Sequence, residues 1–87
     1  MGELHEEFQY AIERVQALEH RPSNSKLLEL YGLYKQASEG DVDGKRPGMT
    51  NPRGRAKFDA WSNRKGLSQD DAKTAYIALA NELDPDA

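Results

Sequence analysis

The chain has 87 residues, enough for one small domain, and we expect a single domain over residues 1–87. It has no cysteine, which excludes disulfides, thiol catalysis and thiolate metal sites. Its formal net charge of -3 argues against a general nucleic-acid binder, and no apolar run approaches the roughly 20 residues that a membrane span requires.

Residues 4–18 have the pattern of an amphipathic helix. Their apolar residues recur at steps of three and four: Leu4, Phe8, Ala11, Ile12, Val15 and Leu18. Arg21-Pro22 should end this helix, because the residue before a proline avoids the helical region. His5 and His20 have no ligand partner at helical spacing, so we expect surface histidines and no metal site.

A second helix is predicted from the serines at 23–25, which are suitable N-caps, to about Ser38, with Gly40 as a C-cap. Tyr31, Tyr34 and Lys35 stand at i, i+3 and i+4, and therefore share a face. Two tyrosine rings beside an ammonium group suit a ligand with a flat ring and an anion. The same spacing also fits tyrosines that fill a core beside a solvated lysine.

A glycine in a helix interior, such as Gly32, destabilises the helix by about 1 kcal/mol relative to alanine. Close approach of another helix or of a ligand would explain this glycine, and simple tolerance is the alternative. Residues 40–52 have three glycines, two prolines and no helical period, which predicts a long loop with a tight turn at Arg46-Pro47-Gly48. We expect Met49 to pin this loop to the core. Helices joined by so long a loop need not be antiparallel neighbours.

The third predicted helix follows Pro52 and runs to about Lys65, with Gly66 as its cap. From Lys45 to Lys65 the net charge is +6, so the rest of the chain carries -9. Such a basic segment in an acidic chain points to a local anion site, although a solvated basic helix face would look the same. Cations at the start of a helix oppose its dipole and are easier to explain if an anion binds there.

A fourth helix is predicted to begin after Ser68, which with Asp71 resembles a capping box, and to end at Asp84-Pro85. Its apolar stripe consists of Ala72, Ala75, Tyr76, Leu79 and Leu83. No segment alternates as a strand would, so the fold class is all-α, with four helices. No phosphate-binding glycine loop, nucleophile elbow or His-Glu metal motif is present, and we therefore expect no enzyme.

Several blocks of this sequence, in one order, resemble the acyl-CoA-binding protein family. The blocks are Tyr31-Gly32-Leu33-Tyr34-Lys35-Gln36-Ala37, Gly40-Asp41, Arg46-Pro47-Gly48-Met49, Lys57-Phe58-Asp59-Ala60-Trp61 and Ala75-Tyr76-Ile77. The resemblance covers nearly the whole chain. It implies a four-helix bundle with a long connection between the second and third helices, and non-enzymatic binding, buffering and transport of medium- to long-chain acyl-CoA esters.

The resemblance also implies a ligand site. By this resemblance, Tyr31 and Tyr34 match tyrosines that flank the nucleotide, and Lys35 and Lys57 match lysines that meet the phosphates. Tyr76 matches a tyrosine of the fourth helix at the site. The segment 31–35, which includes Gly32 and Leu33, matches the segment that lines the cleft. Gln16 stands where the family commonly has a lysine, so one charge-assisted contact is expected to be lost. Phe58 replaces a tryptophan of the family pattern and lacks its indole N–H.

For the remaining properties, we expect a cytoplasmic monomer with no cofactor, no nucleic-acid partner and no membrane insertion. Glu3, Glu6 and Glu7 stand where a secretory signal would need positive charge and then an apolar stretch. The alternative function is a small helical protein-interaction module without a lipid ligand, whose tyrosine face docks a partner helix.

Overall fold

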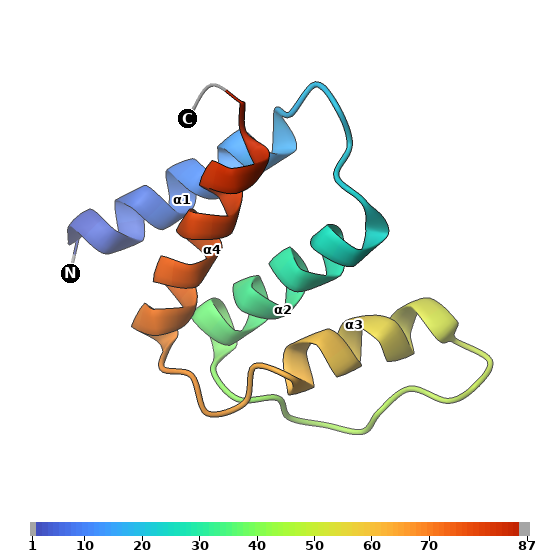
Figure 1. The fold of residues 1–87 in the computed structure, drawn as a ribbon. Helices are drawn as coiled ribbons and strands as arrows, with labels where there is room; N and C mark the ends of the chain where they lie inside the picture. The colour runs from blue at the N-terminus through green and yellow to red at the C-terminus, as the bar shows by residue number, and fades with distance from the viewer. Residues whose placement is uncertain (1, 86–87) are drawn as a thin grey trace.

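The computed structural model describes residues 2–85, which form four α-helices and no strand. The helices are α1 (Gly2–Gln16), α2 (Asn24–Glu39), α3 (Pro52–Ser62) and α4 (Gln69–Leu83) (Figure 1). The longest connection joins α2 to α3 and covers residues 40–51. The predicted all-α fold, with four helices and a long connection between the second and third, is confirmed.

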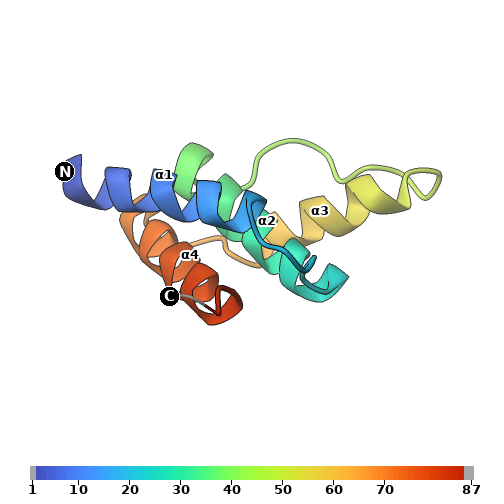
Figure 2. The same cartoon turned by 90° about the horizontal axis from the view of Figure 1, so that it is seen from above.

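The helices form a flat assembly rather than a symmetric bundle. Helix α4 packs against both α1 and α2, whereas α3, among the four helices described, packs against α2 alone. The Cα trace measures 39 × 31 × 14 Å, and Figure 2 shows α3 displaced to one side of the other helices. Helix α2 therefore lies between α4 and α3 and is the element that joins α3 to the other helices.

The hydrophobic core lies between α1, α2 and α4. Phe8 is buried at its centre, with 2% of its surface exposed, and contacts Tyr76 edge to face. The core cluster consists of Phe8, Ala11, Leu30, Leu33, Ala37, Ala72, Tyr76, Leu79 and Ala80. Most of the core residues from α1 and α4 belong to the apolar stripes that the sequence predicts, and α2 adds Leu30, Leu33 and Ala37. Burial of each large side chain contributes about 1.5–3 kcal/mol.

Three of the predicted caps are present. The Oγ of Ser23 accepts a hydrogen bond from the backbone N–H of Lys26 at 3.2 Å, and the Oγ of Ser68 accepts one from Asp71 at 3.0 Å. Both satisfy donors that a helix start leaves free. Gly40 ends α2 with a φ of +84°, a conformation that favours glycine.

The first helix begins and ends two residues earlier than predicted. It ends at Gln16, well before Pro22, because the backbone N–H of Ala17 is shared between the carbonyls of Glu13 and Arg14, both at 3.1 Å. Such sharing tightens the final turn and stops the α-helical ladder. The proline therefore plays no part in ending this helix.

The third helix also ends earlier than predicted, at Ser62 rather than near Lys65. Beyond it the N–H of Arg64 bonds to Trp61, and that of Lys65 to Ser62, so the chain continues in tight turns of the i to i−3 kind. Gly66, with a φ of +99°, lies after these turns and does not cap α3.

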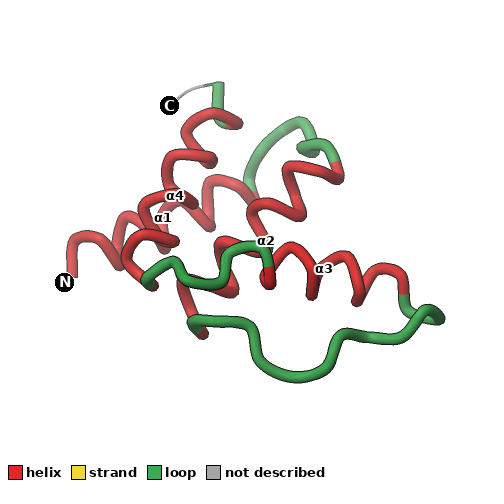
Figure 3. The backbone as a smooth tube through the Cα atoms, turned by 60° about the horizontal axis from the view of Figure 1, so that its bottom comes forward, coloured by secondary structure: helices red, strands yellow, loops and turns green. Residues whose placement is uncertain are grey.

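The long connection runs back along α3 before the chain enters that helix (Figures 1 and 3). The indole N–H of Trp61 donates to the carbonyl of Gly40 at 2.8 Å, and the guanidinium of Arg46 donates to both carboxylate oxygens of Asp59, at 2.9 and 2.7 Å. These bonds attach the connection to α3. The expectation that Met49 pins it to the core is wrong, because 86% of that side chain is exposed.

A buried amide joins the ends of α2 and α3 to the start of α4. The side chain of Gln36 is fully buried, and its Nε2 donates to the Oδ1 of Asp41 and to the carbonyl of Leu67, both at 2.8 Å. The same Oδ1 accepts from the backbone N–H of Gly66 at 2.9 Å. One carboxylate and one amide thus position both connections that flank α3.

The carboxylate of Asp41 should make stability depend on pH. The backbone N–H of Gly66, with the amide of Gln36, holds the pKa of Asp41 below its ordinary value. Its contribution to folding is therefore complete above the unfolded-state pKa of about 4, and disappears as the pH falls through the lower, folded-state pKa. We expect Asp41→Asn to lower the free energy of unfolding at pH 6–7.

The difference between wild type and Asp41→Asn should shrink as the pH falls from about 4 through the lower folded-state pKa, because Asp41 becomes protonated over this range and then lacks the charge in both states. Urea denaturation of the two proteins between pH 2.5 and 7 measures it. A difference that stays constant over this range would show that the charge of Asp41 does not contribute.

Candidate functional site

A groove of about 510 Å³ lies between α2 and α3. Its lining combines apolar side chains, a tyrosine ring and cations: Arg21, Asn24, Leu27, Leu28, Tyr31, Pro52, Arg53, Ala56 and Lys57. No aspartate or glutamate is among them. We call this the α2–α3 cleft. An apolar surface surrounded by positive charge suits a ligand that carries both a flat or apolar part and an anion.

Tyr31 and Lys57 face each other across the cleft. The Nζ of Lys57 lies 5.3 Å from the centroid of the Tyr31 ring, within the range of a cation–π interaction. Within residues 2–85, Lys57 forms no ion pair. Its charge is therefore available to an anion that enters above the tyrosine ring.

Gly32 allows the two helices to come this close. A Cβ atom on Gly32 would lie 2.3 Å from the carbonyl oxygen of Ala60 in α3. No other residue type has room at this crossing, which decides between the two explanations that the sequence left open: the glycine is there for a helix–helix approach. The close approach brings Tyr31 within reach of Lys57.

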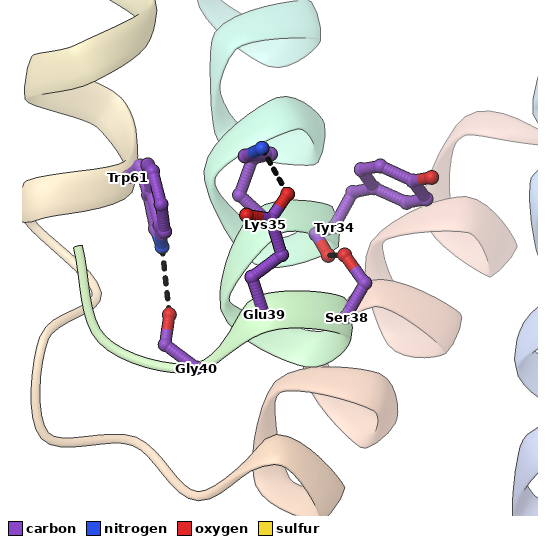
Figure 4. A network of polar contacts seen from close by, with 6 residues as sticks. All are labelled: Tyr34, Lys35, Ser38, Glu39, Gly40 and Trp61. Atoms are coloured by element: carbon purple, nitrogen blue, oxygen red, sulfur yellow. Dashed lines mark hydrogen bonds and ion pairs between the residues drawn. The ribbon is translucent and has the colours of Figure 1, made fainter. Parts of the chain in front are cut away.

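Lys35 lies on α2 beside Trp61 of α3. Its Nζ is 4.7 Å from the centroid of the tryptophan ring and is hydrogen-bonded to the carboxylate of Glu39 (Figure 4). The bond to Glu39 raises the pKa of Lys35 above its ordinary value, and the hydroxyls of Tyr31 and Tyr34 act in the same direction. Lys35 therefore remains a cation at any physiological pH.

Tyr34 does not share the direction of Lys35. Successive residues of a helix are about 100° apart, so adjacent residues point to different neighbours. Figure 4 shows the Tyr34 ring pointing away from Trp61, and this ring stacks on Phe8 of α1 with centroids 6.3 Å apart. The single face expected for Tyr31, Tyr34 and Lys35 is thus divided between α3 and α1.

Tyr76 completes an aromatic cluster on the α1 side of α2. Its ring meets Phe8 edge to face, with centroids 5.3 Å apart, and only 5% of the residue is exposed. Burial raises the pKa of Tyr76 above its ordinary value, and the neighbouring Tyr34 adds to the effect. Tyr34, which is 41% exposed, is the member of this cluster that solvent reaches.

Of the eight residues that the resemblance implied, only Tyr31 and Lys57 line the cleft. Leu33 belongs to the hydrophobic core, because its position on α2 faces the other helices, and its side chain is 3% exposed. Gly32 is buried against α3, and Gln16 is exposed at the end of α1. The structure therefore brings Tyr31 and Lys57 together in the cleft, whereas Lys35 lies beside Trp61, and Tyr34 and Tyr76 lie against Phe8 of α1.

The sequence did not identify all of the residues that line the cleft. Arg21 and Asn24 come from the connection before α2 and from its first turn, where the sequence shows no ligand-binding pattern. Leu27 and Leu28 are apolar residues of a helix, which packing alone would explain. The concentration of arginine at the start of α3 did point to Arg53, which lines the cleft.

A larger hollow, of about 890 Å³, lies where the ends of α1 and α4 meet. Its cation, Arg14, already donates to Asp84 at 3.0 Å and to Asn81 at 2.9 Å. None of the expected site residues lines it. The α2–α3 cleft is therefore the stronger candidate, because Arg21, Arg53 and Lys57 form no ion pair within residues 2–85.

Within residues 2–85, no helix has the length and apolar character to cross a membrane. No group of three or more histidine, aspartate or glutamate side chains in that range is arranged to hold a metal ion.

Comparison with known proteins places the chain in a family. The family model described as acyl CoA binding protein matches residues 5–80. The acyl-CoA-binding protein homolog of Manduca sexta is 51% identical over 81 residues, which cover 92% of this chain and 90% of that protein. The acyl-CoA-binding protein of Saccharomyces cerevisiae is 49% identical over 76 residues, 87% of each chain.

Solved structures agree with the sequence relatives. The crystal structure of Oryza sativa acyl-CoA-binding protein 2 matches with a TM-score of 0.88 and 42% identity, over 92% of this chain and 87% of that one. The solution structure of the yeast acyl coenzyme A binding protein matches with a TM-score of 0.69 and 49% identity, over 87% and 88%. This chain therefore belongs to the acyl-CoA-binding protein family.

Proposed function

We propose that this protein binds medium- to long-chain fatty acyl-CoA esters, and that it buffers and transports them without a catalytic step. The observation that carries the proposal is the α2–α3 cleft, where Lys57 lies over the Tyr31 ring and apolar side chains form the walls. Coenzyme A supplies the matching chemistry, because it has a flat adenine ring beside several phosphates.

The nucleotide part of the ligand would occupy the cleft. The Tyr31 ring offers a stacking surface for adenine, and Lys57 and Lys35 offer charge-assisted hydrogen bonds to phosphate. Arg21 and Arg53, which line the same cleft, add positive charge around it. The basic segment found in the sequence would then offset the negative charge of the ligand.

The acyl chain would add the larger apolar contribution. Each buried methylene contributes about 0.8 kcal/mol, so a sixteen-carbon chain could contribute on the order of 10 kcal/mol. Entropy losses on binding offset much of this. Nanomolar affinity corresponds to about -12 kcal/mol and thus requires both the nucleotide and the acyl chain to contribute.

Some site residues lie away from Lys57 and have proposed roles of a different kind. Tyr34 is exposed beside Phe8 and offers a surface to the ligand, whereas the buried Tyr76 would act by supporting that ring pair. Gln16 would supply a neutral contact where the family commonly has a lysine. Gly32 and Leu33 would act through helix packing.

We further propose that residues 1–87 form one acyl-CoA-binding domain, which acts as a cytoplasmic monomer and binds neither nucleic acid nor a cofactor. The resemblance of the sequence to the family over nearly its whole length supports a single domain. The acidic charge outside the basic segment disfavours nucleic acid, because the phosphate backbone attracts extended positive surfaces.

Calorimetric titration with palmitoyl-CoA, and with free CoA and palmitate in parallel, tests the function. We expect one-to-one binding of the ester at nanomolar Kd, much weaker binding of free CoA and hardly any of palmitate, because only the ester offers both parts. A folded sample that gives no heat with the ester would contradict the proposal and favour the protein-interaction module.

A further inference from the structure

The ion pair between Lys35 and Glu39 involves one of the two lysines to which we assign the ligand's phosphates. Glu39 is the last residue of α2, and its side chain extends back along the helix to the ammonium group of Lys35 (Figure 4). The side chain of Lys35 is 20% exposed and that of Glu39 is 53% exposed. The protein thus pairs a carboxylate of its own with a lysine that the proposed function assigns to a phosphate.

Helix stability does not explain this carboxylate. A negative charge at a helix C-terminus opposes the helix dipole. A lysine followed by a glutamate four residues later is also the less favourable order for a pair on one helix. Glu39 immediately precedes Gly40, the C-cap, and so stands where the dipole effect is largest. The ion pair between Lys35 and Glu39 therefore contributes little to the stability of α2.

Lys35 has a second contact that does not depend on Glu39. Its ammonium lies 4.7 Å from the centre of the Trp61 ring, which belongs to α3 and is buried. Trp61 is itself fixed by the bond from its indole N–H to Gly40. Because a neutral aromatic ring supports the ammonium, Lys35 can exchange one anion for another without losing its position.

We propose that Glu39 competes with the ligand's phosphate for Lys35, and so lowers the affinity of the site for acyl-CoA. In the free protein the carboxylate of Glu39 is paired with the ammonium group of Lys35. A phosphate that binds Lys35 must either displace the carboxylate of Glu39 or bind close to its negative charge, and both cost binding free energy. The inference rests on the proposed function, because it concerns the same site.

Glu39→Gln removes the charge and keeps the length and hydrogen-bonding capacity of the side chain. We expect this variant to bind palmitoyl-CoA about 3- to 10-fold more tightly than wild type at about 20 mM salt, where charge interactions are weakly screened. At about 0.5 M salt the ratio should fall below about 2-fold. Calorimetric titration of both proteins at the two salt concentrations measures these ratios.

Glu82→Gln is the matched control. Glu82 is exposed in the last turn of α4, and forms no ion pair within residues 2–85. Its substitution changes the net charge and the end of a helix in the same way, at a distance from the cleft lining. We expect an affinity within about 1.5-fold of wild type at either salt concentration.

Three outcomes would overturn the inference while leaving the function in place. These are equal affinity of wild type and Glu39→Gln, weaker binding by Glu39→Gln, or the same gain in Glu82→Gln. Weaker binding would mean that Glu39 positions Lys35 for the ligand. Absence of ester binding in every folded protein would instead overturn the proposed function, and this inference with it. Fluorescence of Trp61, the one tryptophan of the chain, verifies that the ring keeps its environment in Glu39→Gln.

Discussion

Lys57→Ala is expected to weaken palmitoyl-CoA binding by about 10- to 100-fold. A hydrogen bond to a charged group contributes about 1.5–3 kcal/mol, and each 1.4 kcal/mol corresponds to a factor of ten in Kd. Lys57 lines the α2–α3 cleft, and no carboxylate in residues 2–85 is paired with it, so its full charge would be used by the ligand. Calorimetric titration with palmitoyl-CoA measures the change.

The loss should come from the ligand contact and not from the fold. Lys57 is exposed on α3, and its removal leaves the buried contact between Gly32 and Ala60 unchanged. The circular dichroism spectrum and the melting temperature of Lys57→Ala should therefore match those of wild type. Weaker binding with intact helices assigns Lys57 to the site.

Lys65→Ala is the control for net charge. Lys65 belongs to the same basic segment and is exposed, but it lies in the turns after α3 and does not line the cleft. We expect its affinity to remain within about 2-fold of wild type, because exposed charges at a distance are screened by salt. Equal losses of affinity in the two variants would mean that binding depends on the total charge of the basic segment and not on Lys57 itself. Unchanged affinity in Lys57→Ala would remove that residue from the site.

The periodicity of the sequence is enough to predict the helices, because each apolar stripe has to be buried. The stripe from Leu4 to Leu18 and the stripe from Ala72 to Leu83 both meet in the core, as the pattern requires. Ser23 and Ser68 cap helices because their hydroxyls satisfy nearby backbone N–H groups. All of these signals are local.

Helix ends and loop contacts depend on residues that are distant in the sequence, and here the predictions failed. Gly66 was expected to cap α3, but its N–H bonds to Asp41, 25 positions earlier. Met49 was expected to pin the connection to the core, but Arg46 and Gly40 attach the connection to α3 and Met49 is exposed. Neither contact has a signature in the local sequence.

The candidate site could be predicted only in part, for the same reason. Spacing places Tyr31, Tyr34 and Lys35 on one helix, but it does not show which neighbouring helix each of them meets. Lys57 meets Tyr31 only because α3 crosses α2 at Gly32. The partnership of Lys35 with Glu39 is local and could have been noticed from the spacing of four, yet its meaning depends on Trp61 from α3.

The crossing at Gly32 leads to the largest expected effect on stability. Gly32→Ala should destabilise the protein by about 2–3 kcal/mol, which lowers the melting temperature of a domain this size by roughly 10–20 °C. Helix propensity alone would give the opposite sign, a gain of about 1 kcal/mol for alanine over glycine inside a helix. The direction of the measured change therefore decides between propensity and packing.

Packing should win because the atoms in the way belong to the backbone. The added Cβ would lie 2.3 Å from the carbonyl oxygen and 2.8 Å from the carbonyl carbon of Ala60. A side chain could rotate away, but a backbone contact is relieved only if α3 shifts away from α2, the helix against which it packs. That movement would also separate Lys57 from Tyr31, so acyl-CoA binding should weaken together with stability.

Gly48→Ala is the matched control, because a Cβ there meets nothing within 4 Å and its φ is not positive. We expect its melting temperature to be equal to that of wild type or slightly higher, since alanine restricts the unfolded chain. Thermal denaturation followed by circular dichroism measures both variants. If Gly32→Ala melted at or above the wild-type temperature, helix propensity would outweigh the contact with Ala60. The close crossing of α2 and α3, from which the cleft is built, would then not be a requirement of the fold.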